Sequence, residues 1–261
     1  MCSEKICNIT FIIYYILTVI NKGDLAALAV LDLTAAFDTV DHKILLQRLQ
    51  SRFGVTGRLM AWIRSYLYQR TLYVHLGSCG SRPQPVFSSV PEESVLGTIL
   101  FLIYIADLPC VIQCHGFQLH LYADETQIYD LCSPSSTDQL QLRLSDCIDD
   151  VANWMRSNQL LLNTEKTEVL WCSSNRRQHL LPPDTVRVGS NYVKPSSSVR
   201  DLGICLDSGV SMWTHVTRTA SRCFGIAPST ADNQTIYASS TPSKGLWCHW
   251  FCPDWTVVKP H

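Results

Sequence analysis

Two acidic motifs about ninety residues apart constrain this chain more than any other feature. In the first, Asp32 follows the apolar run 28–31, and in the second, Asp124 and Glu125 follow the run 121–123. Each run is typical of a short buried strand. Carboxylates that converge from two strands are the ligands that Mg²⁺ prefers. Two such ions about 3.5–4 Å apart can hold the attacking and leaving oxygens of a phosphoryl displacement. The motifs therefore point to nucleotidyl transfer.

Length and composition indicate a globular chain with a real core. The 261 residues suffice for one large domain or two small ones, and 46% of them are hydrophobic against 16% charged. This balance favours a globular chain over a disordered one. The formal charge is −1, whereas a free-standing nucleic-acid binder usually carries a basic surplus.

The cysteines and the N-terminal segment bear on the cellular compartment. Twelve cysteines are scattered without a CxxC pair, which favours reduced thiols in an intracellular protein. The apolar segment Ile9–Ile20 is too short to cross a bilayer comfortably, so we expect a helix buried under the first acidic strand. We therefore expect a location in the cytoplasm, the nucleus or both, without secretion and without a stable membrane partner.

Several segments have the pattern of strands. Residues 28–33 form one candidate strand, and 117–129 alternate as a hairpin with its tip near 123–126. Residues 167–172 form a further strand, and a second β unit runs through 186–206. Because packed helices lie between these strands, we expect an α+β fold.

Two helices follow the first acidic motif. Asp41 is a candidate cap for a helix that ends near Gly54. Thr56 begins the next helix, for which the spacing predicts a core-facing stripe. The members of that stripe are Leu59, Trp62, Ile63, Tyr66 and Leu67.

Two further helices have recognisable starts. Ser94 begins a helix that is apolar nearly all round and should end before Pro109, so we expect it to be deeply buried. Ser136 and Gln139 form a capping-box pattern ahead of a helix that reaches about Ser157.

We expect three parts along the chain. Residues 1–23 are an apolar segment, 24–222 are the ordered domain, and 223–261 lack periodicity. The last part contains prolines without a helical or strand pattern, which is typical of a poorly ordered tail.

Five segments, in order, resemble the reverse transcriptases of non-LTR retrotransposons, the jockey-like long interspersed elements. The resemblance covers about 200 residues. The segments are 31–42, 90–97, 121–127, 158–168 and 199–203, the last resembling the hairpin that grips the primer. The resemblance implies a right-hand polymerase palm with an antiparallel sheet, packed helices and partial fingers and thumb. It also implies RNA-directed DNA synthesis with Mg²⁺ or Mn²⁺, an RNA template, a DNA primer and deoxynucleoside triphosphates.

The resemblance also assigns roles to individual residues. The implied metal ligands are Asp32, the carbonyl of Leu33, Asp124 and Glu125. Lys166 would approach the leaving pyrophosphate as a general acid. The implied nucleotide-binding residues are Phe37, Pro91, Glu92 and Ser94, with Phe37 as the gate against a 2′-hydroxyl.

Departures from the family pattern predict impaired activity. Glu125 replaces an aspartate, and its extra methylene displaces the carboxylate by over an ångström, a misplacement that can cost about 10²-fold in rate. Glu92 replaces a glutamine, and Glu93 replaces a glycine that lets the backbone approach nucleic acid. Basic residues that would hold the triphosphate are nearly missing before Asp32, where only Lys5 and Lys22 occur.

Other interpretations stay open at this point. The first is a catalytically inactive remnant that at most binds nucleic acid or a protein partner. A secreted or membrane-anchored protein would use the segment Ile9–Ile20. A carboxylate-rich metal hydrolase would explain the acidic pairs but not the second and fourth motifs.

Overall fold

The computed structural model describes residues 2–72, 75–76, 79–91, 94–189 and 191–226. The chain divides into two units, residues 1–220 and 221–261, and the features below belong to the first, except that the last helix continues into the second. Most of the predicted tail, from residue 227 onward, lies outside the described residues, as do Glu92 and Glu93.

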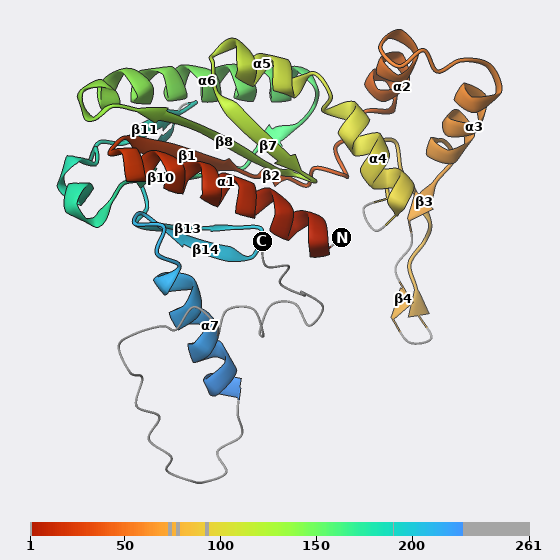
Figure 1. Ribbon diagram of the computed structural model, residues 1–261. Coiled ribbons are helices and arrows are strands. Elements are labelled where there is room, and N and C mark those ends of the chain that lie inside the picture. The colour runs from red at the N-terminus through yellow and green to blue at the C-terminus, as the bar shows by residue number, and fades with distance from the viewer. Residues whose placement is uncertain (1, 73–74, 77–78, 92–93, 190, 227–261) are drawn as a thin grey trace, which may run out of the picture. The chain divides into compact units, whose positions relative to one another are not determined.

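The centre of the first unit is an antiparallel sheet of four strands in the order β10-β1-β8-β7 (Figure 1). The strands are β1 (Leu25–Leu31), β7 (Gln118–Tyr122), β8 (Glu125–Cys132) and β10 (Glu168–Cys172). The chain is α+β, as the sequence predicts. A division into palm, fingers and thumb stays a prediction.

Strand β1 is buried along its whole length because the sheet is covered on both faces. Successive side chains of a strand point to opposite faces. Ala27, Ala29 and Leu31 belong to the core that includes α6 (Thr137–Ser157). Ala26, Leu28 and Val30 belong to the core that includes α1 (Cys2–Lys22) and β14 (Ile204–Asp207).

Helix α1 confirms the prediction for the segment Ile9–Ile20. Ile9, Ile12 and Ile16 are buried against the sheet, and Figure 1 shows the helix crossing the face opposite α6. The other side of α1 is open, with Tyr14 70% exposed.

Helix α2 (His42–Ser51) begins where the sequence predicts. The Asp41 side chain accepts hydrogen bonds from the backbone N–H groups of Lys43 at 2.7 Å and Ile44 at 3.0 Å. This bonding satisfies two of the free donors at the helix start.

Helix α3 (Gly57–Leu67) corrects the predicted stripe. Ile63 and Leu67 are buried, but Leu59 and Trp62 are each 54% exposed. Met60 takes the buried position instead. The helix packs through one narrow side, so the apolar spacing alone places too many residues in the core.

Helix α4 (Val95–Tyr104) is less buried than its composition predicts. It buries Leu100, Phe101 and Tyr104, while Val95 is 81% exposed and Ile99 is 47% exposed. The prediction of deep burial is therefore wrong, because the helix is packed on one side only.

Helix α5 (Leu108–Cys114) follows α4 and was not predicted. Pro109 lies in its first turn, where a missing N–H costs nothing. In the part of the chain that the structure describes, no single helix is long and apolar enough to cross a membrane, although α4 and α5, bent by 41°, reach that size together.

Helix α6 begins after Ser136, as predicted, but the capping box does not form. Ser136 makes no side-chain bond to the helix start, and its Oγ contacts Ser133 Oγ at 3.0 Å. A short 3₁₀ turn, Pro134–Ser136, enters the helix and holds Ser136 away from the capping geometry.

The remaining elements are short and connect or flank the sheet. They are β2 (Leu33–Thr34), β3 (Thr71–Leu72), β4 (His75–Leu76), β5 (Cys79–Gly80), β6 (Gln84–Pro85), β9 (Leu161–Leu162), η2 (Asn175–Leu180), β11 (Val186–Val188), β12 (Asn191–Val193), β13 (Ser198–Asp201) and α7 (Trp213–Ile226).

Candidate active site

The strand register brings the predicted site residues to one level of the sheet. Strand β1 pairs with β8 through Leu31 and Thr126, and with β10 through Val30 and Glu168. When both registers are continued past the end of β1, Asp32 lies between Glu125 and Lys166. Side chains directly opposite on paired strands project from the same face. On the side of β10, Asp32 forms an ion pair, in which Lys166 Nζ lies 2.9 Å from Asp32 Oδ2.

The hairpin β7–β8 places Asp124 in its turn. Tyr122 pairs with Glu125, which leaves Ala123 and Asp124 as a two-residue loop. Ala123 has a φ of 50°, as the primed turns of tight hairpins require. The predicted hairpin tip is therefore confirmed.

The charges of all three carboxylates act on the Lys166 ammonium. A hydrogen bond from Lys166 to Asp32, and then the Asp32 charge, raise the pKa of Lys166. Desolvation opposes this rise, and the charges of Asp124 and Glu125 add to it. Lys166 is 69% exposed, whereas Asp32 is only 14% exposed. The site thus joins a sheltered acid to a lysine that a ligand can reach.

Asn163 holds the turn that carries Lys166. Its backbone N–H donates to the Asp32 carbonyl at 2.9 Å. Its side-chain Oδ1 accepts from the Lys166 N–H at 3.3 Å, and its carbonyl accepts from Thr167 Oγ1 at 2.8 Å. The sequence indicated no role for Asn163, although an asparagine that bonds a nearby backbone group is typical of turns.

The carbonyl of Leu33 faces away from β9. Leu33 pairs with Leu162, and the bond from Asn163 N–H to the Asp32 carbonyl marks that pair as the non-hydrogen-bonded kind. In such a pair the N–H and C=O groups point away from the partner strand. The Leu33 carbonyl is therefore directed toward the side where Asp124 lies.

Phe37, in the first motif, is held by contacts with the second motif and with α4. It is only 7% exposed, and its ring lies 4.7 Å from that of Phe101 on α4. Its carbonyl accepts from the N–H of Val90 at 2.9 Å. The structure thus brings the second motif next to Phe37.

The second motif forms a tight turn around Ser94. Ser94 Oγ accepts from Gly97 N–H and donates to the Pro91 carbonyl, both at 2.9 Å. A Cβ at Gly97 would lie 1.8 Å from the Pro91 oxygen, so only glycine fits there. Ser94 is the cap of α4, and Glu92 lies outside the described residues.

A buried carboxyl on β13 supports the hairpin β7–β8. Asp201 on β13 is fully buried, and its Oδ1 accepts from Gln127 Nε2 at 2.8 Å. Gln127 follows Glu125 by two residues and so shares its face of β8. Burial raises the pKa of Asp201 to about 7, although the Gln127 bond lowers it, and the Glu125 charge raises it further. Nothing in the sequence pattern indicated this pair.

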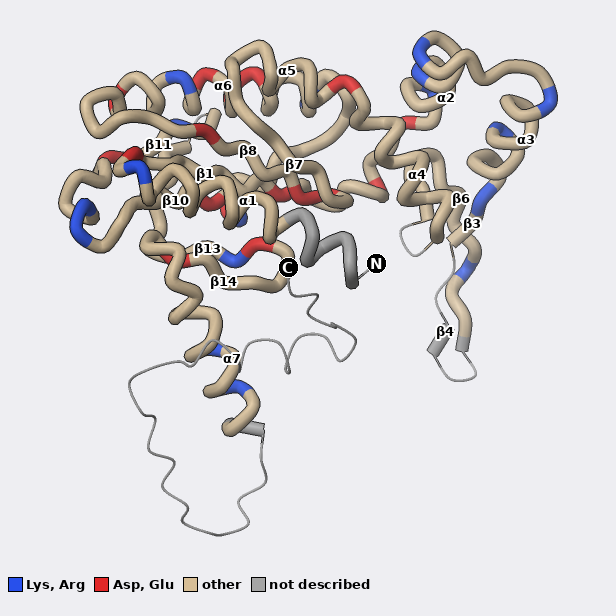
Figure 2. Tube along the Cα trace, viewed as in Figure 1, with Lys and Arg blue, Asp and Glu red and all other residues tan. Residues whose placement is uncertain are grey.

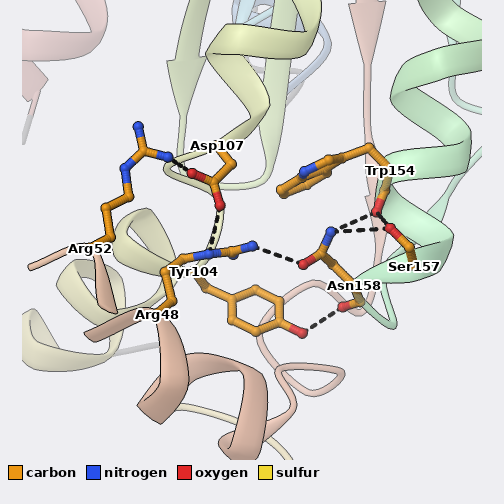
Figure 3. A network of polar contacts seen from close by, with 7 residues as sticks. All are labelled: Arg48, Arg52, Tyr104, Asp107, Trp154, Ser157 and Asn158. Carbon is orange, nitrogen blue, oxygen red and sulfur yellow. Dashed lines mark hydrogen bonds and ion pairs between the residues drawn. The ribbon is translucent and has the colours of Figure 1, made fainter. Parts of the chain in front are cut away.

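Arg48 links three helices to the turn that leads toward Lys166 (Figure 3). Its Nε lies 2.9 Å from Asp107, and its Nη2 donates to Asn158 Oδ1 at 2.9 Å. The Asn158 carbonyl accepts from Tyr104 OH at 2.5 Å. Arg52 also pairs with Asp107. This network fixes the end of α6, from which the chain proceeds to β9.

The site has the donor chemistry for a divalent cation but does not form a ready cage. Carboxylate and carbonyl oxygens suit Mg²⁺ and Mn²⁺. Within the described ranges, however, no group of three or more His, Cys, Asp or Glu is arranged to hold a metal ion.

Similar structures include two telomerases. A telomerase from Candida tropicalis, truncated from its C-terminal domain, aligns with a TM-score of 0.49 and 14% identity over 77% of this chain and 39% of that one. The telomerase of Candida albicans aligns with a TM-score of 0.46 and 13% identity, over 82% of this chain and 37% of that one.

Sequence comparison is more specific. A probable RNA-directed DNA polymerase from transposon BS of Drosophila melanogaster is 27% identical over 74% of this chain and 21% of that protein. The RNA-directed DNA polymerase from mobile element jockey of the same species is 25% identical over 79% of this chain and 22% of that protein. The chain thus spans about a fifth of these relatives. The family described as reverse transcriptase (RNA-dependent DNA polymerase) matches residues 12–206. The chain belongs to the reverse transcriptase family and is related to the enzymes of non-LTR retrotransposons.

Proposed function

We propose that this chain carries the polymerase site of a retrotransposon reverse transcriptase, which adds deoxynucleotides to a primer 3′-OH on an RNA template. One observation carries the proposal. The strand registers, continued past the end of β1, place Asp32 level with Glu125 on one side and Lys166 on the other, and Asp124 lies in the adjoining hairpin turn. Acids from separate strands at one point suit phosphoryl transfer.

Asp32, Asp124, Glu125 and the carbonyl of Leu33 would hold Mg²⁺ or Mn²⁺. Bound ions neutralise charge on the attacking and leaving oxygens. Lys166 already contacts Asp32 Oδ2 at 2.9 Å, so the ammonium and a divalent ion compete for that oxygen.

The protein's own groups account for proton transfer and selection. The raised pKa keeps Lys166 protonated at neutral pH, as a proton donor to a leaving pyrophosphate must be. Phe37, held against Phe101, is rigid enough to exclude a 2′-hydroxyl. Pro91, Glu92 and Ser94 would line the nucleotide site, with Ser94 acting through the turn that it caps.

The second candidate is an inactive remnant that binds nucleic acid or a protein partner. Glu92 and Glu93 favour it, because the family has a glutamine and a glycine at these two positions of the second motif. The longer side chain of Glu125 favours it as well. We therefore expect slow synthesis rather than full activity.

The proposed partners follow from the reaction. They are an RNA template, a DNA primer and deoxynucleoside triphosphates, with no stable membrane partner. We propose a location in the cytoplasm, the nucleus or both.

Primer extension on a homopolymer RNA template with Mg²⁺ or Mn²⁺ tests the proposal. Asp32→Asn should abolish extension, whereas Asp184→Asn, at an exposed acid outside the site, should leave it unchanged. Extension that survives Asp32→Asn would refute the assignment. A complete lack of extension by the unmodified chain would favour the inactive remnant.

A further inference from the structure

Two buried oxygen atoms on one face of the sheet have no hydrogen-bond partner among the described residues. They are Gln127 Oε1 on β8 and Asp201 Oδ2 on β13. Both residues are fully buried. Val30, which lies opposite Gln127, and Val199, on the same strand as Asp201, belong to an apolar core. A buried polar atom without a partner costs free energy, so these two oxygens require an explanation.

The hydrogen bond that joins the two side chains suggests how both oxygens are satisfied. Gln127 Nε2 donates to Asp201 Oδ1 at 2.8 Å. A side-chain amide has an N–H donor next to a C=O acceptor, and a protonated carboxyl group has an acceptor next to an O–H donor. The two groups are therefore complementary. A proton on Asp201 Oδ2 can be donated to Gln127 Oε1, which gives both oxygens a partner.

The surroundings of Asp201 favour a neutral carboxyl group. In the described part of the chain Asp201 forms no ion pair. Burial raises its pKa to about 7, against the bond from Gln127, and the charge of Glu125 on β8 adds to the rise. On β10, the Glu168 carboxylate accepts from a backbone N–H of β13 at 3.3 Å. On β7, burial lowers the pKa of His120, so this ring brings no positive charge near neutral pH. A buried carboxyl group without a cation is stable as the acid.

The pair of Asp201 and Gln127 joins two hairpins next to the proposed active site. Asp201 lies at the end of β13, in the segment that resembles the primer-gripping hairpin, and Gln127 lies on the hairpin β7–β8. The trace carries acidic segments both on β13 and around the tip of that hairpin (Figure 2). Glu125 precedes Gln127 by two residues and shares its face of β8. One hydrogen bond leaves the Gln127 amide free to turn, whereas two bonds fix its plane and so fix the part of β8 that carries Glu125.

We propose that Asp201 carries a proton in the folded protein and donates it to Gln127 Oε1, and that the resulting two-bond pair positions Glu125. The pair has no net charge and links β13 to β8. Asp201 is thus a positioning residue that acts through Gln127. Its positioning role rests on the proposed polymerase function, whereas the existence of the pair does not.

Infrared spectroscopy tests for the proton. The difference spectrum between the unmodified chain and Asp201→Asn, with ¹³C-labelled aspartate at about pH 6, should contain the C=O band of a protonated carboxyl group. Asp184→Asn, at an exposed acid, is the control and should remove carboxylate bands only. In a Gln127→Leu background the band of Asp201 should shift, because the O–H group loses its acceptor. Carboxylate bands alone, or a band that Gln127→Leu leaves unmoved, would overturn the proposal.

Urea unfolding at the same pH measures how strongly the two side chains depend on each other. Asp201→Leu and Gln127→Leu should each lower the urea midpoint, because each leaves a buried polar partner unsatisfied. The double variant should lose less than the sum of the two single losses. Asp201→Asn should lose less than Asp201→Leu, since an amide can accept from Gln127 Nε2 and donate to Oε1. A double variant that loses the full sum would overturn the pair.

Primer extension measures the positioning role, after circular dichroism has established that the variants are folded. Asp201→Leu should lower the extension rate by about 10-fold or more, because displacing a catalytic group by an ångström can cost about 10²-fold. Oligonucleotide binding should be unchanged, and Asp201→Asn should restore the rate. The matched control is Leu206→Ala, in the same apolar core, which should lower stability and leave the rate nearly unchanged.

The outcomes separate the pair from the polymerase site. An equal loss of rate in Asp201→Leu and Leu206→Ala would reduce Asp201 to a general part of the core and overturn its positioning role. No extension by the unmodified chain would refute the polymerase site, whereas the infrared and unfolding measurements would still decide whether the acid and the amide form the pair.

Discussion

Replacing the buried Asp201 by asparagine should make the stability of the protein depend less on pH. Asp201 is fully buried, and its pKa is raised from 3.8 to about 7, mainly by burial. A raised pKa means that the native state holds this proton more tightly than the unfolded chain. The stabilisation that this proton gives the native state is therefore complete below about pH 4 and is lost as the pH rises through 7.

The magnitude follows from the size of the shift. A difference of about three pKa units corresponds to about 4 kcal/mol at about 1.36 kcal/mol per unit. Most of this stabilisation is lost between pH 5 and pH 8, where the loss amounts to about 2–3 kcal/mol of unfolding free energy. An asparagine at this position still accepts from Gln127 Nε2 but has no proton to lose. Asp201→Asn therefore removes the pH dependence of stability that Asp201 causes.

Urea unfolding at pH 5 and pH 8, followed by circular dichroism, measures the effect. Between pH 5 and pH 8, the free energy of unfolding of Asp201→Asn should rise by about 2–3 kcal/mol relative to that of the unmodified chain. Asp184→Asn, at an exposed acid, serves as the control and should show no such gain. The reasoning would be refuted if Asp201→Asn and the unmodified chain differed in free energy of unfolding by the same amount at pH 5 and at pH 8.

Three further predictions concern the site and its support. Phe37→Val should admit ribonucleotides and so raise the ratio of ribonucleotide to deoxynucleotide incorporation. An unchanged ratio would mean that Phe37 only packs in the core and is not the gate. Lys166→Gln should lower primer extension by about 10²-fold, as loss of a general acid does, with unchanged oligonucleotide binding. Arg48→Met should destabilise the fold by about 1–3 kcal/mol in urea, because Asn158 loses its buried partner. Arg52→Met, at a half-exposed ion pair, should cost less than about 1 kcal/mol.

The sequence predicted the parts of the fold that depend on local pattern. The strand before Asp32, the hairpin tip at Asp124 and the cap at Asp41 are all confirmed. Each rests on alternation or on a hydrogen bond within a few residues. These local signals suffice because the sheet is covered on both faces and its register is strongly specified.

Burial was harder to predict because it depends on what packs against each helix. Trp62 and Val95 lie in apolar patterns yet are exposed, since α3 and α4 each pack through one side. The pair of Gln127 and Asp201 joins residues 74 positions apart. No local pattern in the sequence indicates such a contact.

Restoring the family pattern tests the central claim most directly. Glu125→Asp shortens a carboxylate, Glu92→Gln and Glu93→Gly remove two negative charges, and the glycine also opens the backbone. Primer extension by this triple variant should exceed that of the unmodified chain and should vanish when Asp32→Asn is added. No extension by the triple variant, or a gain that survives Asp32→Asn, would contradict the claim that these carboxylates form a polymerase site.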